Sequence, residues 1–412
     1  MKKEEEFREL YKNENLDLNQ IKLLIQNGID VNETDNKDGW NALHLLCIYN
    51  DSEKLIDAME FLIQIGIDVN GKTSIGRNAL HCLCCNNSSE KLIDAMEFLI
   101  QIGINVNARD NEGLNALHLL CSNNSSEKLI DLILLLLQNG IDVNGRDNEG
   151  LNALHWLCTH SSSEKLTDLI LLLLQNGIDV NGKDNDGWNA LHLLCSNHSN
   201  EKLIEAMQLL IQNGINVNEE TNSGVNAFYV LCLYHSSEKL IDAMELLIQN
   251  GIDMSGKRNG GVNALLLLCS NTSNIPSEKL IDAMQFLIQN GIDVNGKDNS
   301  SGWNALHLLC SNYSSEKLID VIRFLIQNGI DVNGKDNNGV NALHLLCANN
   351  PSEQLTVAMQ VLIQNGIDVN EETNDGENAF HLLCQVRLSQ KIMDALQLLI
   401  ENGIQCNGGY DI

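Results

Sequence analysis

Residues 183–219 read KDNDGWNALHLLCSNHSNEKLIEAMQLLIQNGINVNE, and this stretch decides the fold because close copies of it fill the chain. Its heptapeptide NALHLLC begins at Asn189. The ten versions of this heptapeptide begin at Asn41, Asn78, Asn115, Asn152, Asn189, Asn226, Asn263, Asn304, Asn341 and Asn378. Successive versions lie 37 residues apart, except for one step of 41 residues after Asn263. A fixed period of this size predicts a solenoid, in which each unit buries its apolar face only against its neighbours.

Each unit reads as two helices and a finger-like loop. The polar residues 184–187 end in glycine and predict a tight turn, and Asn189 suits the N-cap of a short, apolar helix. We expect Glu201 to open a second helix, whose apolar residues recur every three or four positions, and Asn213-Gly214 to end it. Apolar and polar residues then alternate in an extended finger. The pattern predicts an all-α repeat solenoid of stacked helix-turn-helix units with extended finger loops.

These stretches resemble the ankyrin repeat, whose pattern runs D-x-x-G-x-T-P-L-H-L-A-A, then a second helix, then G-A-D-V-N. The matching sequences are DNDGWNALHLLC and LLIQNGIDVN, and the resemblance covers nearly the whole chain. Asn-Ala stands where the family has Thr-Pro, and Leu-Cys stands where it has Ala-Ala. Each unit is also longer than the usual length of about 33 residues, with the extra residues between its two helices.

The period divides the chain into a degenerate N-terminal capping repeat, residues 1–34, and ten ankyrin-type repeats. In the capping repeat a charged segment from Glu4 to Lys12 replaces the first helix, while LNQIKLLIQNGIDVN supplies a second helix and a finger. The ten repeats over 35–412 span 35–71, 72–108, 109–145, 146–182, 183–219, 220–256, 257–297, 298–334, 335–371 and 372–412.

Composition excludes several classes of function. The chain has 26 basic and 55 acidic residues, a net charge of −29, which argues against a nucleic-acid-binding surface. The longest apolar runs are too short to span a bilayer, so we expect no membrane insertion. The N-terminal MKKEEEF lacks the apolar segment of a secretory signal, which favours the cytoplasm, with the nucleus as the alternative.

Histidine and cysteine recur three residues apart in the short helix, a spacing that would interest a search for metal. Successive packed helices lie roughly 8–10 Å apart, however, too far for two units to share one tetrahedral ion. We therefore expect no metal and no cofactor, not even at the denser cluster of His81, Cys82, Cys84 and Cys85. The cysteines are expected to be buried thiols. The resemblance implies that the histidines join neighbouring loops by hydrogen bonds.

No nucleophile elbow, P-loop or dinucleotide fingerprint is present, so we expect no enzyme. The resemblance instead implies a non-catalytic scaffold that binds a partner protein, a basic one among the alternatives, through a concave groove and the finger loops. In the ankyrin family the residue after the turn glycine faces this groove. Here the position varies while its neighbours repeat. The predicted partner-binding residues are Trp40, Arg77, Leu114, Leu151, Trp188, Val225, Val262, Trp303, Val340 and Glu377.

Two further features leave alternatives open. A finger asparagine follows a leucine by eight residues, as at Asn70, Asn144 and Asn333, and such asparagines can be hydroxylated in animal ankyrin proteins. The alternative is that they only hold the finger by hydrogen bonds. Tyr229 and Leu266 replace the recurring histidine, which predicts weaker interfaces in the middle of the array.

The leading function is thus a protein-binding scaffold, which we expect to be monomeric. One alternative is an adaptor that delivers a partner to an enzyme such as a ubiquitin ligase, although no adaptor box is visible. A host-directed effector of a parasite or symbiont is another, and a spacer element that binds nothing is a third.

Overall fold

The computed structural model describes residues 10, 17–28, 30–34, 38–49, 53–85, 91–122, 128–160, 164–197, 201–234, 239–254, 261–270, 277–311, 317–348, 354–386 and 389–405. Over these residues the chain consists of helices joined by turns and loops, without a β-strand. The predicted all-α class is therefore confirmed. The charged segment expected from Glu4 to Lys12 lies outside the described residues, apart from Leu10.

The chain forms two compact units, Met1–Asn216 and Val217–Ile412. In the first unit α2 (Leu18–Gln26) precedes five pairs, each made of a short helix and a longer one. The pairs are α3 (Ala42–Tyr49) with α4 (Leu55–Gln64), α5 (Ala79–Cys85) with α6 (Leu92–Gln101), α7 (Ala116–Ser122) with α8 (Leu129–Gln138), α9 (Ala153–His160) with α10 (Leu166–Gln175), and α11 (Ala190–Ser196) with α12 (Leu203–Gln212).

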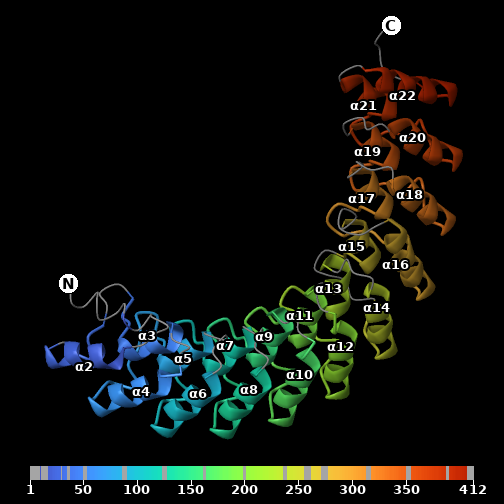
Figure 1. Cartoon of the computed structure of the whole chain (residues 1–412). Coiled ribbons are helices and arrows are strands. Elements are labelled where there is room, and N and C mark those ends of the chain that lie inside the picture. Colours follow the sequence, from blue (N-terminus) through green and yellow to red (C-terminus); the bar gives the residue numbers. More distant parts are fainter. Residues whose placement is uncertain are drawn as a thin grey trace. The chain divides into compact units, whose positions relative to one another are not determined.

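The second unit repeats the arrangement. Its pairs are α13 (Ala227–Tyr234) with α14 (Leu240–Gln249), α15 (Ala264–Ser270) with α16 (Ser277–Gln289), α17 (Ala305–Ser311) with α18 (Lys317–Gln327), α19 (Ala342–Ala348) with α20 (Leu355–Gln364), and α21 (Ala379–Gln385) with α22 (Gln390–Glu401). Within each unit the short helices pack in one row and the long helices in a second row beside it (Figure 1).

The short helix forms because its first turn is capped in the way the sequence predicts. In α11 the Asn189 side chain accepts hydrogen bonds from the backbone N–H groups of Leu191 and His192, both at 3.1 Å. The His192 ring in turn accepts from the Asn189 N–H. This reciprocal pairing satisfies N–H groups that a helix start leaves open. Leu194 and Cys195 are fully buried, and the short helix is buried on most of its sides.

The long helix presents one apolar stripe to this core. In α12 the stripe consists of Leu203, Ala206, Met207 and Leu210, each with no exposed side-chain surface. The expected start at Glu201 is wrong by two residues. The Ala206 N–H donates to the Lys202 carbonyl at 2.9 Å, so regular helix begins at Leu203. Most of the extra residues between the two helices therefore stay out of the long helix.

Glycines make the turns between repeats. Gly150 has φ of +85°, and a Cβ at this position would lie 2.9 Å from the backbone nitrogen of Asn185 in the next repeat. Any other residue would be strained and would push the neighbouring turn away. The finger that follows each long helix is itself folded back, because the Gly145 N–H donates to the Asp142 carbonyl.

Candidate partner-binding surface

The ten predicted partner-binding residues follow the turn glycines, and the turn holds their backbone firmly. The Trp188 N–H donates to Asp184 Oδ1 at 2.7 Å, and the Asp184 N–H donates to the Trp188 carbonyl at 2.9 Å. Leu114 and Val225 are buried, with only 5% of their surface exposed. The other eight are half-buried. The stripe is therefore partly available to a partner, but not at these two positions, where packing of the turn covers the side chain.

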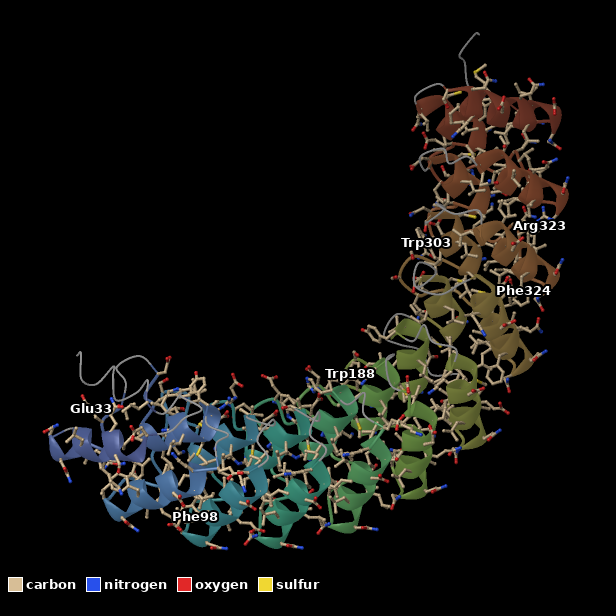
Figure 2. The ribbon with its side chains drawn as sticks, viewed as in Figure 1. Glu33, Phe98, Trp188, Trp303, Arg323 and Phe324 are labelled. Atoms are coloured by element: carbon tan, nitrogen blue, oxygen red, sulfur yellow. The ribbon has the colours of Figure 1, made fainter. Side chains whose placement is uncertain are left out.

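Two members of the stripe also join neighbouring repeats. The Arg77 Nε donates to Asp110 Oδ2 at 3.0 Å, and the Trp303 Nε1 donates to Asp336 Oδ2 at 3.2 Å. Both aspartates belong to the next turn along the chain. Because buried and half-buried ion pairs restrict a side chain, Arg77 is less free to contact a partner than its exposure alone would indicate. Figure 2 shows Trp188 on the short-helix edge of the first unit and Phe98 on its long-helix edge.

Sequence reasoning missed several aromatic residues on the short helices. Tyr49 is 49% exposed and packs against Trp40, with ring centroids 5.8 Å apart. Trp156 stacks on His160 at 4.9 Å, and its Nε1 donates to Asp147 Oδ2 at 2.9 Å. A signal for Trp156 was present in the sequence, since this tryptophan stands where most other units have leucine. We call Trp40, Tyr49, Trp156, His160 and Trp188 the aromatic surface of the first unit.

The recurring histidines join loops as the resemblance implied. His118 shows the arrangement in full. Its Nδ1 accepts from the Asn115 N–H at 3.1 Å, and its Nε2 lies 3.0 Å from the Gly145 carbonyl and 3.2 Å from the Leu151 carbonyl. An acceptor role for Nδ1 fixes the proton on Nε2, so the ring is neutral. Burial lowers the pKa of His118, which favours the same neutral form.

The cluster of His81 and three cysteines is packed rather than open. The His81 Nε2 is 3.0 Å from the Leu114 carbonyl, and Cys82 and Cys84 are buried. Burial raises the pKa of Cys82 to about 12, which keeps it a thiol. The half-buried Cys85 accepts from the Arg77 guanidinium at 3.4 Å. Across the described ranges, no three His, Cys, Asp or Glu side chains are placed to hold one metal ion.

The finger asparagines make two hydrogen bonds each. For Asn144, Nδ2 donates to the Gly177 carbonyl at 2.9 Å and Oδ1 accepts from the Asp179 N–H at 2.7 Å. Asn70 and Asn333 make the same pair of bonds. This geometry supports the alternative in which the asparagine holds the finger.

Hydroxylation of Asn70, Asn144 and Asn333 stays a prediction. The β-carbon takes no part in the two amide hydrogen bonds, so an added hydroxyl group would leave both bonding atoms in place. We expect mass spectrometry of finger peptides from protein isolated from its own cells to find one added oxygen atom on each asparagine. Fully unmodified peptides would contradict this.

In the middle of the array, one of the two residues that replace the recurring histidine still makes a hydrogen bond to its finger loop. The Tyr229 hydroxyl, buried in place of a histidine, donates to the Met254 carbonyl at 3.3 Å. Leu266 is also buried but its side chain has no polar atom to donate. The two substitutions are therefore not equivalent. At the second one, the finger keeps the hydrogen bond from Asn263 Nδ2 to the Asp293 carbonyl at 3.0 Å but receives none from position 266.

Hydrogen exchange should reveal this difference. We expect amides between Gly224 and Ser277 to exchange faster than those of flanking repeats, most of all around α15, because array stability is close to a sum of unit and interface contributions. Exchange followed by mass spectrometry will measure it. Equal protection in α15 and α17 would contradict the expectation.

Paired helices in two rows, turned by glycine and joined by recurring histidine and asparagine bonds, define a helical repeat solenoid. The family model for ankyrin repeats (3 copies) matches residues 11–110, 89–184, 160–258, 233–336, 276–358 and 315–410, which together cover nearly the whole chain. The chain belongs to the ankyrin repeat family. A comparison with curated proteins gave no match. No helix in the described part of the chain is both long and apolar enough to cross a membrane.

Proposed function

We propose that the array is a non-catalytic scaffold that binds a partner protein through its short helices and finger loops. The observation that supports this most is the aromatic surface of the first unit. Trp156 and Trp188 are half-buried, so their backbones and one side of each ring are fixed while part of the ring stays accessible. Interface energy concentrates on such fixed aromatic side chains, because they lose little conformational freedom on binding.

The opposite face of the first unit has another character. The long helices expose carboxylates such as Asp57, Glu60, Glu97 and Asp131. Exposed single charges contribute only about 0–1 kcal/mol to an interaction, although together they raise the rate at which a basic partner arrives. We therefore assign affinity to the aromatic surface and steering to the acidic face.

The test is to capture the partner by cross-linking and then to measure its affinity for variants. Trp188→Ala should weaken binding by roughly 1–3 kcal/mol, because a partly buried aromatic anchor is lost. Far-UV circular dichroism should stay unchanged, since the ring is not part of the central core. Glu97→Gln on the long-helix face is the matched control and should change affinity by less than about 1 kcal/mol.

The reverse result would contradict the proposal. If Glu97→Gln and similar changes abolish binding while Trp188→Ala and Trp156→Ala do not, the acidic face is the binding site. If cross-linking captures no partner on either face, the result would favour a spacer function.

A further inference from the structure

The finger asparagines form a regular ladder along the array. In each rung a primary amide bridges two backbone groups of the next finger: Nδ2 donates to a glycine carbonyl, and Oδ1 accepts from the N–H two residues later. In the second unit Asn218 does this with Gly251 at 2.9 Å and Asp253 at 2.6 Å. The described rungs are those of Asn32, Asn70, Asn107, Asn144, Asn181, Asn218, Asn295, Asn333 and Asn370.

At one position of the ladder in the second unit, residue 255, the sequence has no asparagine, and this residue lies outside the described part of the chain. Ser255 stands in the sequence where the other fingers have asparagine. The finger that would receive the rung offers the Gly291 carbonyl and the Asp293 N–H, and no hydrogen bond from another described residue reaches either group. Ile292 between them is half-buried, whereas Ile252 and Ile330 at the same position are 7% and 4% exposed. Among the described residues these two backbone groups therefore have no hydrogen-bond partner, and Ile292 is more exposed than its counterparts.

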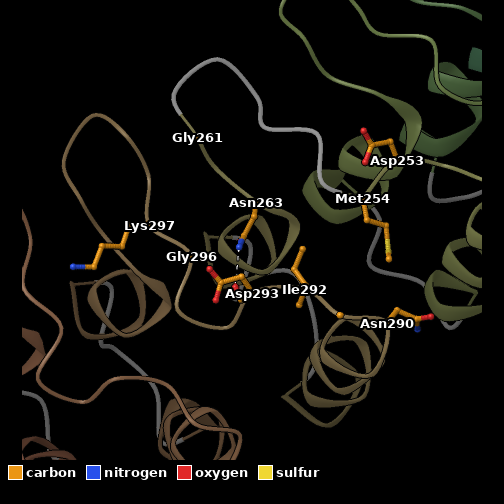
Figure 3. A pocket seen from close by; sticks show the side chains of 10 residues that line it. Asp253, Met254, Gly261, Asn263, Asn290, Ile292, Asp293, Gly296 and Lys297 are labelled. Carbon is orange, nitrogen blue, oxygen red and sulfur yellow. Dashed lines mark hydrogen bonds between the residues drawn. The ribbon is translucent and has the colours of Figure 1, made fainter.

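A second link is absent at the same place. In regular repeats the short-helix histidine approaches the last glycine of its own finger, as His118 approaches Gly145. Leu266 replaces that histidine, so the carbonyl of Gly296 has no such partner. Gly291, Asp293 and Gly296 all line one open cavity of about 440 Å³, together with Met254 and Asn263 (Figure 3). One polar cleft therefore lies where the sequence has lost both the finger asparagine and the short-helix histidine.

The chemistry of the cleft selects its ligand. The Gly291 carbonyl can accept a hydrogen bond and the Asp293 N–H, two residues later, can donate one. A guanidinium or ammonium group has no acceptor, and a carboxylate has no donor. The lining carries both signs of charge, because Lys297 joins Asp253 and Asp293 there, so the missing donor and not the charge argues against a carboxylate. A primary amide supplies both groups in one rigid plane, and nine rungs of this chain use it for the same pair of backbone atoms.

We propose that this cleft binds the carboxamide of an asparagine or glutamine side chain presented by a loop of a partner protein. The inference rests on the proposed protein-binding function and adds to it a second contact, separate from the aromatic surface. The Met254 side chain, which lines the cavity, would cover the aliphatic part of the entering residue.

The experiment uses the full chain and a peptide copied from its own fingers. The peptide is GIDVNG, the sequence of residues 140–145, acetylated and closed with an N-methylamide so that asparagine carries its only primary amide. Isotope-labelled protein is titrated with the peptide and followed by NMR. The backbone resonances of Ile292 and Asp293 should shift in a saturable way. Peptides with Asn→Asp or Asn→Ser should shift them at least tenfold less at the same concentration.

A variant of the protein tests the same assignment from the other side. Ser255→Asn restores the asparagine of a regular finger, so its own amide should occupy the cleft. We expect peptide-induced shifts to fall at least tenfold and exchange of the Asp293 amide to slow roughly fivefold, as one added hydrogen bond of about 1 kcal/mol implies. Ser223→Asn, on an exposed turn of the same unit, is the control and should change neither.

Three outcomes would overturn the proposal: no shift at Asp293 with the asparagine peptide, equal shifts with all three peptides, or an unchanged response in Ser255→Asn. None of them depends on a captured partner. If Trp188→Ala weakens the captured partner but the peptide does not bind, the scaffold function stands and the cleft does not. If the peptide binds and no partner is captured, the cleft is supported and the scaffold function is not.

Discussion

Acidification from pH 7 to pH 5 is expected to destabilise the array by several kcal/mol, the largest effect expected of any single change. Burial lowers the pKa of the short-helix histidines His81, His118, His155, His307 and His344. For His155 the folded pKa is about 4, whereas an unfolded histidine titrates near 6.5. The unfolded chain therefore binds more protons at every pH between these values.

Because the unfolded chain binds more protons, the array loses stability as the pH falls. The stabilising contribution is complete above about pH 6.5 and is lost as the pH falls towards the folded pKa. At pH 5 His155 alone should cost roughly 2 kcal/mol, and four more histidines act in the same direction. The structural cause is burial of the ring, which removes the water that would solvate the charged form. The His155 Nδ1 lies 3.1 Å from the Asn152 backbone nitrogen and 2.6 Å from Asn152 Oδ1.

Urea unfolding at pH 7, 6 and 5, followed by far-UV circular dichroism, measures the effect. The midpoint should fall steadily with pH. The chain supplies an internal control, because Leu266 occupies the histidine position of α15. Local hydrogen exchange in that helix should depend less on pH than exchange in α9. Equal stability at pH 7 and pH 5 would show that the histidines can be protonated in place.

The sequence allowed the unit to be predicted because its information is local. The cap at Asn189, the stripe that includes Leu210 and the stop at Gly214 each follow from residues within one turn of each other. The histidine links could be expected only through the family resemblance, since the atoms joined lie 27 or 33 residues apart. The wrong start at Glu201 has a simple cause: a carboxylate favours a helix terminus without fixing which residue begins it.

The candidate site was less predictable than the fold. Leu114 is buried and Leu151 is half-buried, a difference that their shared position after the turn glycine does not encode. Tyr49 and Trp156 were missed because they lie on the repeating short helix, where a change of residue is interpreted as a change in core packing. The cleft beside Gly291 could not be predicted either. It depends on how the described residues Met254, Asn263 and Gly296 come together around one finger, which periodicity alone does not show.

Among the substitutions proposed for this chain, replacement of one inter-repeat histidine should have the largest effect on the free energy of unfolding. We expect His118→Ala to reduce the free energy of unfolding of its region by about 2–4 kcal/mol. The Gly145 carbonyl and the Asn115 N–H would lose their partner in a buried place, and each unpaired buried group costs about 1–3 kcal/mol. The Leu151 carbonyl keeps the Asp147 N–H as a donor at 3.0 Å, so it adds little.

His381 provides the matched control, because it occupies the same position in the last repeat. Its Nδ1 accepts from the Asn378 N–H at 3.1 Å, but its Nε2 makes no hydrogen bond to another described residue, and the ring is only half-buried. His381→Ala should therefore cost less than about 1 kcal/mol.

The measurement must be local, because a long repeat array need not unfold in one step. Hydrogen exchange by mass spectrometry should show faster exchange in α7 and α9 for His118→Ala, and almost no change in α19 or α21 for His381→Ala. Equal effects of the two substitutions would mean that histidine stabilises each repeat by capping its own helix. A larger effect at His118, spread over two repeats, would show that the bonds to the loops at Gly145 and Leu151 couple neighbouring units into one array.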